Sequence, residues 1–121
     1  TTSAIEWDLD GALRAANDGG VNLQDEYKNT VQTLSKAQLN EINDARNKIS
    51  RAAGIYPKVI IDSNNDINAY ATWHSGQPII GITLGLIRAT QNDIDALAAV
   101  IGHEHAHLTL ALFIYVCHDE C

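Results

Sequence analysis

Two histidines and a glutamate near the end of the sequence have the types and the spacing to support chemistry. His103 and His107 lie four residues apart, with Glu104 between them, in an H-E-x-x-H pattern. On an α-helix, residues four apart project from the same face, so the two imidazoles could occupy adjacent corners of a zinc tetrahedron. Glu104 is too close in sequence to add a third corner, but it could take a proton from a metal-bound water and deliver it to a leaving amine. The pattern predicts Zn²⁺ bound by His103 and His107, Glu104 as the general base, and hydrolysis of an amide bond.

The motif must be held by a helix. Thr90, with Asp93 three residues on, predicts the N-cap of that helix. Its core face is predicted to carry Ile94, Leu97, Ala98, Ile101 and Leu108. At about 100° per residue, the two motif histidines fall on the opposite face, among Ala96, Ala99 and Val100. These small or apolar neighbours favour the floor of a cleft over a solvated surface.

Other candidate ligands have simpler interpretations. His105 falls among the core-face residues and is predicted to be packed rather than to bind metal. His74 follows a predicted strand and is interpreted as a turn residue, with a role in substrate binding as the alternative. Asp62, Asp66 and Asp93 are interpreted as turn and cap residues, because the glycine-containing pattern of a calcium loop is missing.

The remaining elements predict an α+β domain. Ser35 and Gln38 form a predicted capping box that starts a helix over residues 36–53, which ends at Gly54. A helical piece is predicted over residues 23–34, and residues 5–17 fit either a short helix or a strand. Strands are predicted over residues 58–62, 67–73 and 78–83. Their short connections favour a small, three-stranded, largely antiparallel sheet.

The composition excludes some classes of protein. A net charge of −7, with eight Lys and Arg residues, argues against binding to nucleic acid. The longest apolar run, residues 110–117, is far shorter than the roughly 20 residues of a membrane-spanning helix, but its apolar surface predicts packing against the domain or self-association. Cys117 and Cys121 do not describe a disulfide scaffold, and they could bind a second metal or be incidental. We expect one domain over residues 1–121.

The segments around the motif resemble a known family of peptidases. The resemblance covers roughly residues 67–110, and it is carried by Asn68-Ala69-Tyr70-Ala71, Ile79-Ile80-Gly81-Ile82 and Ala98-Ala99-Val100-Ile101-Gly102 before the motif. These segments are similar to the metallopeptidase family of the CAAX prenyl endopeptidases and HtpX, which includes soluble periplasmic members and the small minigluzincins. The resemblance implies a zincin-like, zinc-dependent endopeptidase of the gluzincin type. It also implies an extended or unfolded peptide or protein substrate that pairs with a strand lining the cleft.

The same resemblance implies a third zinc ligand that is not evident. The family takes it from a glutamate on a helix downstream of the motif, and this sequence ends fourteen residues after His107. We expect the chain to lack that helix. His118, Asp119 and Glu120 could replace the ligand if the motif helix breaks and folds back.

The alternative function is a catalytically incompetent, gluzincin-like binding or regulatory domain. A deformylase-type hydrolase resembles the chain less, because its cysteine ligand lies upstream of the motif and both cysteines here lie downstream. The sequence itself identifies no compartment, and the resemblance favours the bacterial periplasm or cell envelope.

Overall fold

The chain folds as an α+β arrangement of short strands and four described helices. The computed structural model describes residues 6–91 and 93–120, and in the last helix it describes the side chains of residues 95–110. The helices are α1 Leu9–Ala15, α2 Lys36–Ala53, α3 Leu84–Ala89 and α4 Ile94–Glu120. The strands are β1 Glu6–Asp8, β2 Val21–Gln24, β3 Thr30–Leu34, β4 Lys58–Asp62, β5 Ala69–His74 and β6 Gln77–Thr83.

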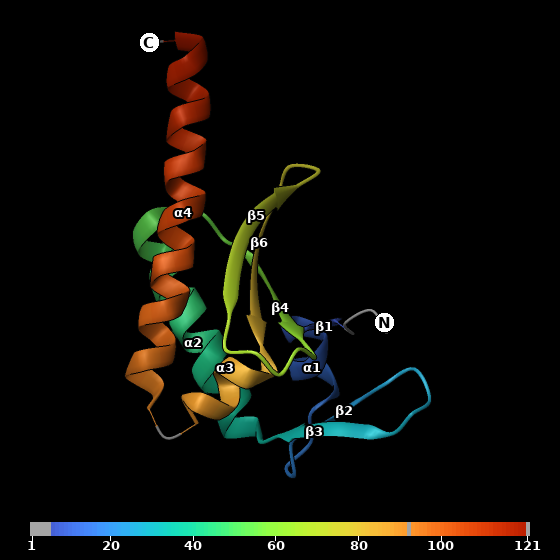
Figure 1. Cartoon of the computed structure of the whole chain (residues 1–121). Coiled ribbons are helices and arrows are strands. Elements are labelled where there is room, and N and C mark those ends of the chain that lie inside the picture. Colours follow the sequence, from blue (N-terminus) through green and yellow to red (C-terminus); the bar gives the residue numbers. More distant parts are fainter. Residues whose placement is uncertain (1–5, 92, 121) are drawn as a thin grey trace.

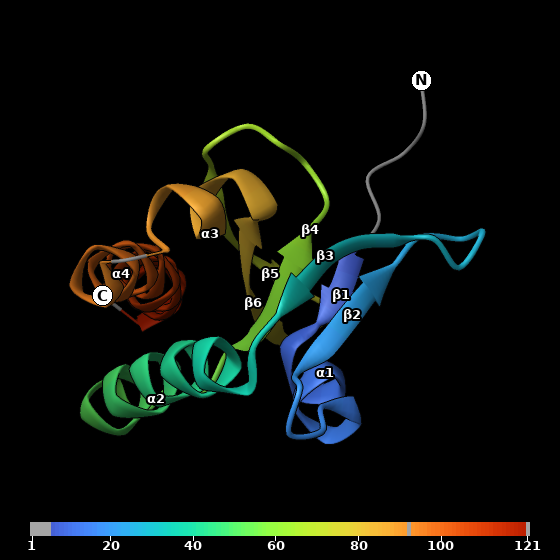
Figure 2. The ribbon, with the colours of Figure 1, turned by 90° about the horizontal axis from the view of Figure 1, so that it is seen from below.

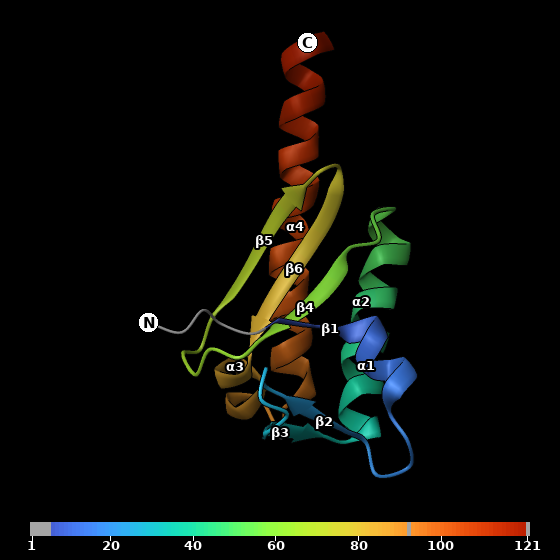
Figure 3. The same ribbon diagram turned by 90° about the vertical axis from the view of Figure 1, so that its right-hand side faces the viewer.

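Four of the strands form a mixed sheet in the order β1-β4-β6-β5 (Figure 3). β4 runs parallel to β6, whereas β1 is antiparallel to β4 and β5 is antiparallel to β6. β6 takes an interior position because its side chains from Ile80 to Thr83 are buried. The second half of β5 is exposed, which suits a strand at the edge of the sheet.

The predicted three-stranded, largely antiparallel sheet is therefore wrong in strand number and in the order and direction of β4, whereas the antiparallel pairing of β5 with β6 is confirmed. The connection between β4 and β5 is short, but it does not form a hairpin. Its backbone is bound by residues at and just after the end of β6, because Asn68 N donates to the Thr83 hydroxyl and Gly85 N donates to the Asn64 carbonyl. A Cβ at Gly85 would lie 2.1 Å from the Asn65 carbonyl oxygen, so glycine permits this close approach. The loop thus carries the chain past β6 to the far edge.

The predicted helical piece over residues 23–34 is also wrong, because this segment forms the β2–β3 hairpin. Leu23 and Leu34 enter the core from the two strands. The turn is stabilised locally by Asp25, whose carboxylate accepts hydrogen bonds from Tyr27 N and Asn29 N. A side chain that bonds to the backbone in this way favours a turn over a helix.

Local capping signals explain why the helix α2 was predicted correctly. α2 spans the predicted residues, with the reciprocal capping box of Ser35 and Gln38 at its start and Gly54 in the left-handed conformation after its end. The ambiguous first segment contains both predicted alternatives in succession, the strand β1 and then the helix α1. Asp8 separates them as the N-cap of α1.

The helix α4 begins at a different cap from the one predicted. Asp93 is the residue whose carboxylate accepts a hydrogen bond from Ala96 N, whereas Thr90 ends the short helix α3, which was not predicted. α3 intervenes because Thr83 caps it by accepting a hydrogen bond from Leu86 N. α2 and α4 then pack side by side (Figure 2), and α4 also contacts β5 and β6.

The second half of α4 extends past the rest of the domain, as Figures 1 and 3 show. The apolar run that includes residues 111–117 was predicted to pack against the domain or to self-associate. The side chains of these residues lie outside those that the structure describes. In the described part of the chain, no helix combines the length and the apolar content that crossing a membrane requires.

A buried arginine joins α1 to α2. Arg46 is 1% exposed, and its guanidinium donates to both carboxylate oxygens of Asp10, at 3.2 and 2.8 Å. It also lies over the Tyr56 ring, 4.8 Å from the ring centroid. The hydrogen bond from Arg46 holds the pKa of Asp10 below its ordinary value, against an opposing effect of burial.

We expect Asp10→Asn to lower the stability of the domain at pH 7. A carboxyl group with a depressed folded-state pKa stabilises the fold above its unfolded pKa, and this contribution is lost as the pH falls through the folded pKa. The cost is on the order of 1 kcal/mol, because Asp10 is partly exposed and solvent screens the pair. Urea unfolding should show the full difference between variant and parent at pH 7, and this difference should shrink progressively as the pH falls from about 4 through the lower folded pKa of Asp10. A difference that does not shrink over this range would contradict the assigned ion pair.

Candidate metal centre

The side chains of His103 and His107 converge on the exposed side of α4. Their Nε2 atoms are 3.0 Å apart, and their rings are nearly perpendicular, with centroids separated by 4.6 Å. Both residues are exposed, and Glu104 between them is half-buried. The structure therefore brings together the two predicted ligands in a position that solvent or a ligand can reach.

The opposite side of α4 is the one that packs into the core, as predicted. Leu97, Ile101 and Leu108 are buried. Ala98 is half-buried, and the side chain of Ile94 lies outside the described ones. Of the residues predicted to floor a cleft, Val100 packs against the core cluster, while Ala99 is exposed.

His105 is a packed residue, as predicted, and it fixes the rotation of α4. It is 1% exposed, and its Nε2 atom donates a hydrogen bond to the Ile55 carbonyl at 2.8 Å. Because His105 lies between the two motif histidines in sequence, burying it turns His103 and His107 outward. The segment after α2 thus orients the side of α4 that carries the histidine pair.

A second contact places the edge strand beside the motif. The indole Nε1 of Trp73, near the end of β5, donates to the Leu108 carbonyl at 3.4 Å. Glu104 lies one turn before Leu108, so it is on the side of the histidine pair that faces β5. Sequence analysis did not single out Trp73, because this contact joins residues 35 apart.

The backbone of β5 presents hydrogen-bonding groups at its outer edge. Trp73 is opposite Pro78 in the β5–β6 ladder, and proline has no N–H group, so this pair does not exchange backbone hydrogen bonds. Alternation along the ladder then directs the N–H and C=O groups of Ala71 and Trp73 away from β6. A proline opposite an edge residue is the sequence signal that could have identified this register.

The histidine pair fits part of a zinc site. Zn–N bonds of about 2.0–2.1 Å in a tetrahedron require the two nitrogens to be roughly 3.3–3.4 Å apart. The observed 3.0 Å separation is close to this requirement, so small rotations of the rings would suffice. Among the residues that the structure describes, no group of three His, Cys, Asp or Glu side chains is placed to hold a metal ion. The described geometry thus supplies two candidate ligands.

The predicted replacement ligands do not reach this pair through a fold-back. The backbone of α4 is helical from Ile94 to Glu120 without a break. At 1.5 Å per residue, position 118 is about 16 Å along the helix from His107. His74 is the exposed last residue of β5 rather than part of the turn itself. The side chains of Cys117 and Cys121 lie outside the described ones.

The sequence of this region matches a family of peptidases. Residues 30–111 match the profile of Peptidase family M48, which covers more than half of the chain. The chain therefore belongs to Peptidase family M48, and the resemblance predicted from the motif region is confirmed. The match also includes β3 and α2, which sequence analysis had not connected with the family.

The name of a similar protein is consistent with this family. The chain is 33% identical over 80 residues to a protein named Protease HtpX homolog from Salinibacter ruber (strain DSM 13855 / M31). The aligned segment covers 64% of this chain and 28% of the relative. The chain thus spans about a quarter of the length of the relative that it matches.

Proposed function

We propose that this chain carries the metal-binding and general-base residues of a zinc endopeptidase. His103 and His107 hold the metal, and Glu104 is the general base. The observation that supports this assignment most directly is the 3.0 Å approach of the two Nε2 atoms on the exposed side of α4, in a chain of the M48 family.

The proposed chemistry divides the roles among three side chains. A bound zinc ion would lower the pKa of a water ligand to about 7 and polarise the scissile carbonyl. The imidazoles of His103 and His107 ligate through Nε2, so both must be unprotonated at that atom. The Glu104 carboxylate, next to the pair on the side facing β5, accepts a proton from the attacking water and donates it to the leaving amine.

The edge of β5 provides the proposed place for the substrate. An extended peptide can add to a free sheet edge through its backbone, and the outward N–H and C=O groups of Ala71 and Trp73 are the partners that it would use. The Trp73–Leu108 hydrogen bond keeps this edge beside α4. A peptide held there lies on the Glu104 side of the histidine pair, as cleavage requires. The substrate class is therefore an extended or unfolded polypeptide.

One observation favours a second function, a binding domain without turnover. The described part of the chain brings two histidines together, whereas catalytic zinc sites usually have three protein ligands. The decisive experiment is incubation of the zinc-loaded chain with fluorescently labelled unfolded casein. Cleavage that a chelator abolishes supports the endopeptidase, and casein binding without any cleavage supports the binding domain.

We expect Ala71→Pro to weaken substrate binding by about tenfold while the domain remains folded. Proline removes one outward N–H group, and an edge strand tolerates it where that group faces solvent. Tyr70→Pro is the matched control, because the N–H group of Tyr70 faces β6 and its loss should instead destabilise the sheet. Casein binding by fluorescence anisotropy and thermal unfolding separate the two effects. Unchanged binding in a folded Ala71→Pro variant would contradict the proposed substrate edge.

A further inference from the structure

Two strands of the sheet have a face that none of the described helices covers. In Figure 3, β5 and β6 lie in front of α4, and their near side is open. Side chains along β5 alternate between the two faces. Ala69 and Ala71 pack against the core cluster, on the α4 side. The alternate residues Tyr70, Thr72 and His74 line a hollow of about 370 Å³ on the other side, the open face of the sheet.

The hollow has an apolar floor and an aromatic wall. Ile60 of β4 and Ile79 of β6 line it, and both are half-buried. Tyr70 is opposite Gly81 in the β5–β6 ladder. A Cβ at Gly81 would collide with the Tyr70 ring, so the ring lies directly over this glycine and depends on its small size. The open face thus offers apolar surface beside an aromatic ring.

The charged groups at the hollow do not select a ligand of either sign. Glu6 of β1 and Lys58 of β4 both line it, so one carboxylate and one ammonium are present. Tyr70 adds no charge near pH 7, because burial raises its pKa and the negative charges of Glu6 and Asp62 raise it further. An apolar side chain is therefore the group that gains most from this hollow.

A peptide paired with the edge of β5 would place one of its side chains at this hollow. Thr72 lies between Ala71 and Trp73, whose outward backbone groups would pair with the peptide. In an antiparallel pairing, the peptide residue opposite Thr72 forms a non-hydrogen-bonded pair, the kind that brings side chains closest. Its diagonal neighbours on the same face are Tyr70 and His74. Thr72 itself is short, so it leaves the way to the hollow open.

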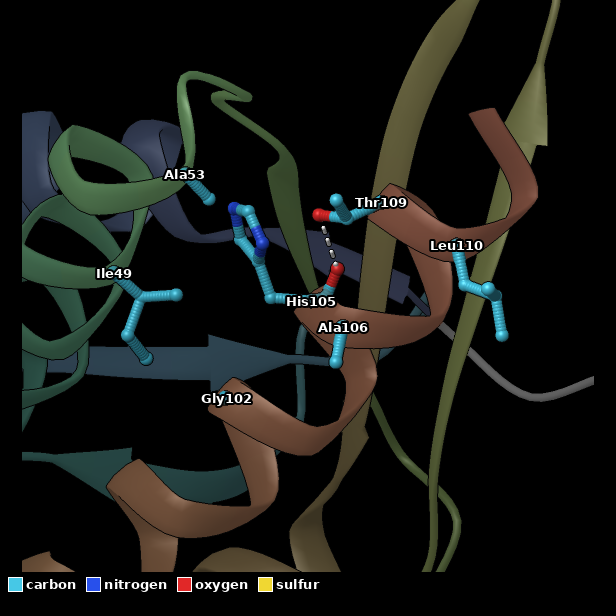
Figure 4. Close-up of a pocket in the computed structure, with 7 residues that line it drawn as sticks. All are labelled: Ile49, Ala53, Gly102, His105, Ala106, Thr109 and Leu110. Atoms are coloured by element: carbon cyan, nitrogen blue, oxygen red, sulfur yellow. Dashed lines mark hydrogen bonds between the residues drawn. The ribbon is translucent and has the colours of Figure 1, made fainter. Parts of the chain in front are cut away.

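A second hollow of the domain does not border this edge. It lies between α2 and α4, and its described lining comes from these two helices alone, from Ile49 and Ala53 of α2 to Leu110 of α4 (Figure 4). No described residue of β5 lines it. A peptide on the edge of β5 therefore meets the hollow on the open face.

We propose that the open face selects an aromatic side chain at the substrate position opposite Thr72, and that Tyr70 and His74 determine this preference. Diagonal cross-strand neighbours are about 7–8 Å apart, a distance that aromatic side chains span. Rings at such positions make edge-to-face or offset contacts, which add to the gain from apolar burial. The inference rests on the proposed substrate edge of β5, and it gives His74 a contact with the substrate.

Binding of model peptides to the whole chain tests this preference without requiring turnover. The probes are heptapeptides of threonine whose central residue is Phe, Ala, Glu or Lys, and they compete with fluorescently labelled unfolded casein in anisotropy measurements. Uniform flanks allow any register, so the central residue can settle opposite Thr72. The Phe peptide should bind about tenfold more tightly than the Ala peptide. The Glu and Lys peptides should bind no more tightly than the Ala peptide.

Variants of His74 show whether the preference arises at the open face. His74 is exposed, so its variants should stay folded. His74→Ala should reduce the preference for Phe over Ala to about threefold, and His74→Phe should restore it, because a ring again flanks the site. Gln77→Ala is the matched control. Gln77 is exposed and pairs with His74 but is not among the residues that line the hollow, so the preference should not change.

Three results overturn the proposal: equal binding of the Phe and Ala peptides, tighter binding of the Glu or Lys peptide, and a preference for Phe that His74→Ala leaves intact. The Ala71→Pro variant separates this failure from failure of the proposed substrate edge. If Ala71→Pro weakens casein binding while the Phe and Ala peptides bind equally, the edge stands and the selectivity is wrong. If Ala71→Pro leaves casein binding unchanged, both are wrong.

Discussion

Replacing Glu104 with glutamine is expected to lower the rate of peptide hydrolysis by about 10²–10⁴-fold, the usual contribution of a general base. Glutamine keeps the shape of the side chain but cannot accept the proton of the attacking water. The motif histidines are untouched, so metal binding should be retained. Initial rates of casein cleavage and metal content, measured on the same protein preparation, separate the two properties.

The control for this prediction is an acidic residue that the proposed chemistry does not use. Asp95, in the first turn of α4, is exposed, and Asp95→Asn removes the same charge from the same helix. It should leave the rate within about twofold of the parent. A Glu104→Gln variant that cleaves as fast as the parent would show that the proposed mechanism is wrong, even if zinc is bound.

The second large effect concerns the metal itself. His103→Ala/His107→Ala should abolish zinc binding, because it removes both of the nitrogens that converge on α4. Binding by the parent should weaken as the pH is lowered, because a protonated imidazole cannot ligate. With two described protein ligands, the affinity of the parent should be low. Elemental analysis after dialysis and calorimetric titration with zinc measure both quantities.

An exposed histidine elsewhere provides the matched control for the metal prediction. His74, at the end of β5, is exposed, and His74→Ala should leave the zinc content unchanged. Thermal unfolding should show that the double variant remains folded, since His103 and His107 are exposed and contribute little to the core. A parent chain that holds no more zinc than the double variant would contradict the assigned ligands.

The sequence predicted those parts of the structure that depend on neighbouring residues. α2 was predicted at both ends because Ser35, Gln38 and Gly54 are signals that act within one turn of the helix. The burial of His105 and the exposure of His103 followed from the helical period alone. Local periodicity therefore determined which side of α4 carries the candidate metal centre.

The parts that could not be predicted depend on contacts between distant residues. The position of β5 at the edge results from hydrogen bonds that hold the β4–β5 connection against Thr83 and Gly85. The length of this connection, which was the basis of the prediction, does not reveal these hydrogen bonds. The Trp73–Leu108 contact is of the same kind. The pairing of β2 with β3 is also of this kind, and it lies where the hydrophobic pattern had suggested a helix.

The hydrogen bond between His105 and the Ile55 carbonyl bears on the affinity of the proposed metal centre. Because it holds α4 at a fixed rotation, folding itself brings the nitrogens of His103 and His107 close together. Preorganised ligands lose less conformational entropy on binding. Substituting His105 should therefore weaken zinc binding, although His105 is not an assigned ligand, because the imidazoles of His103 and His107 would be less ordered.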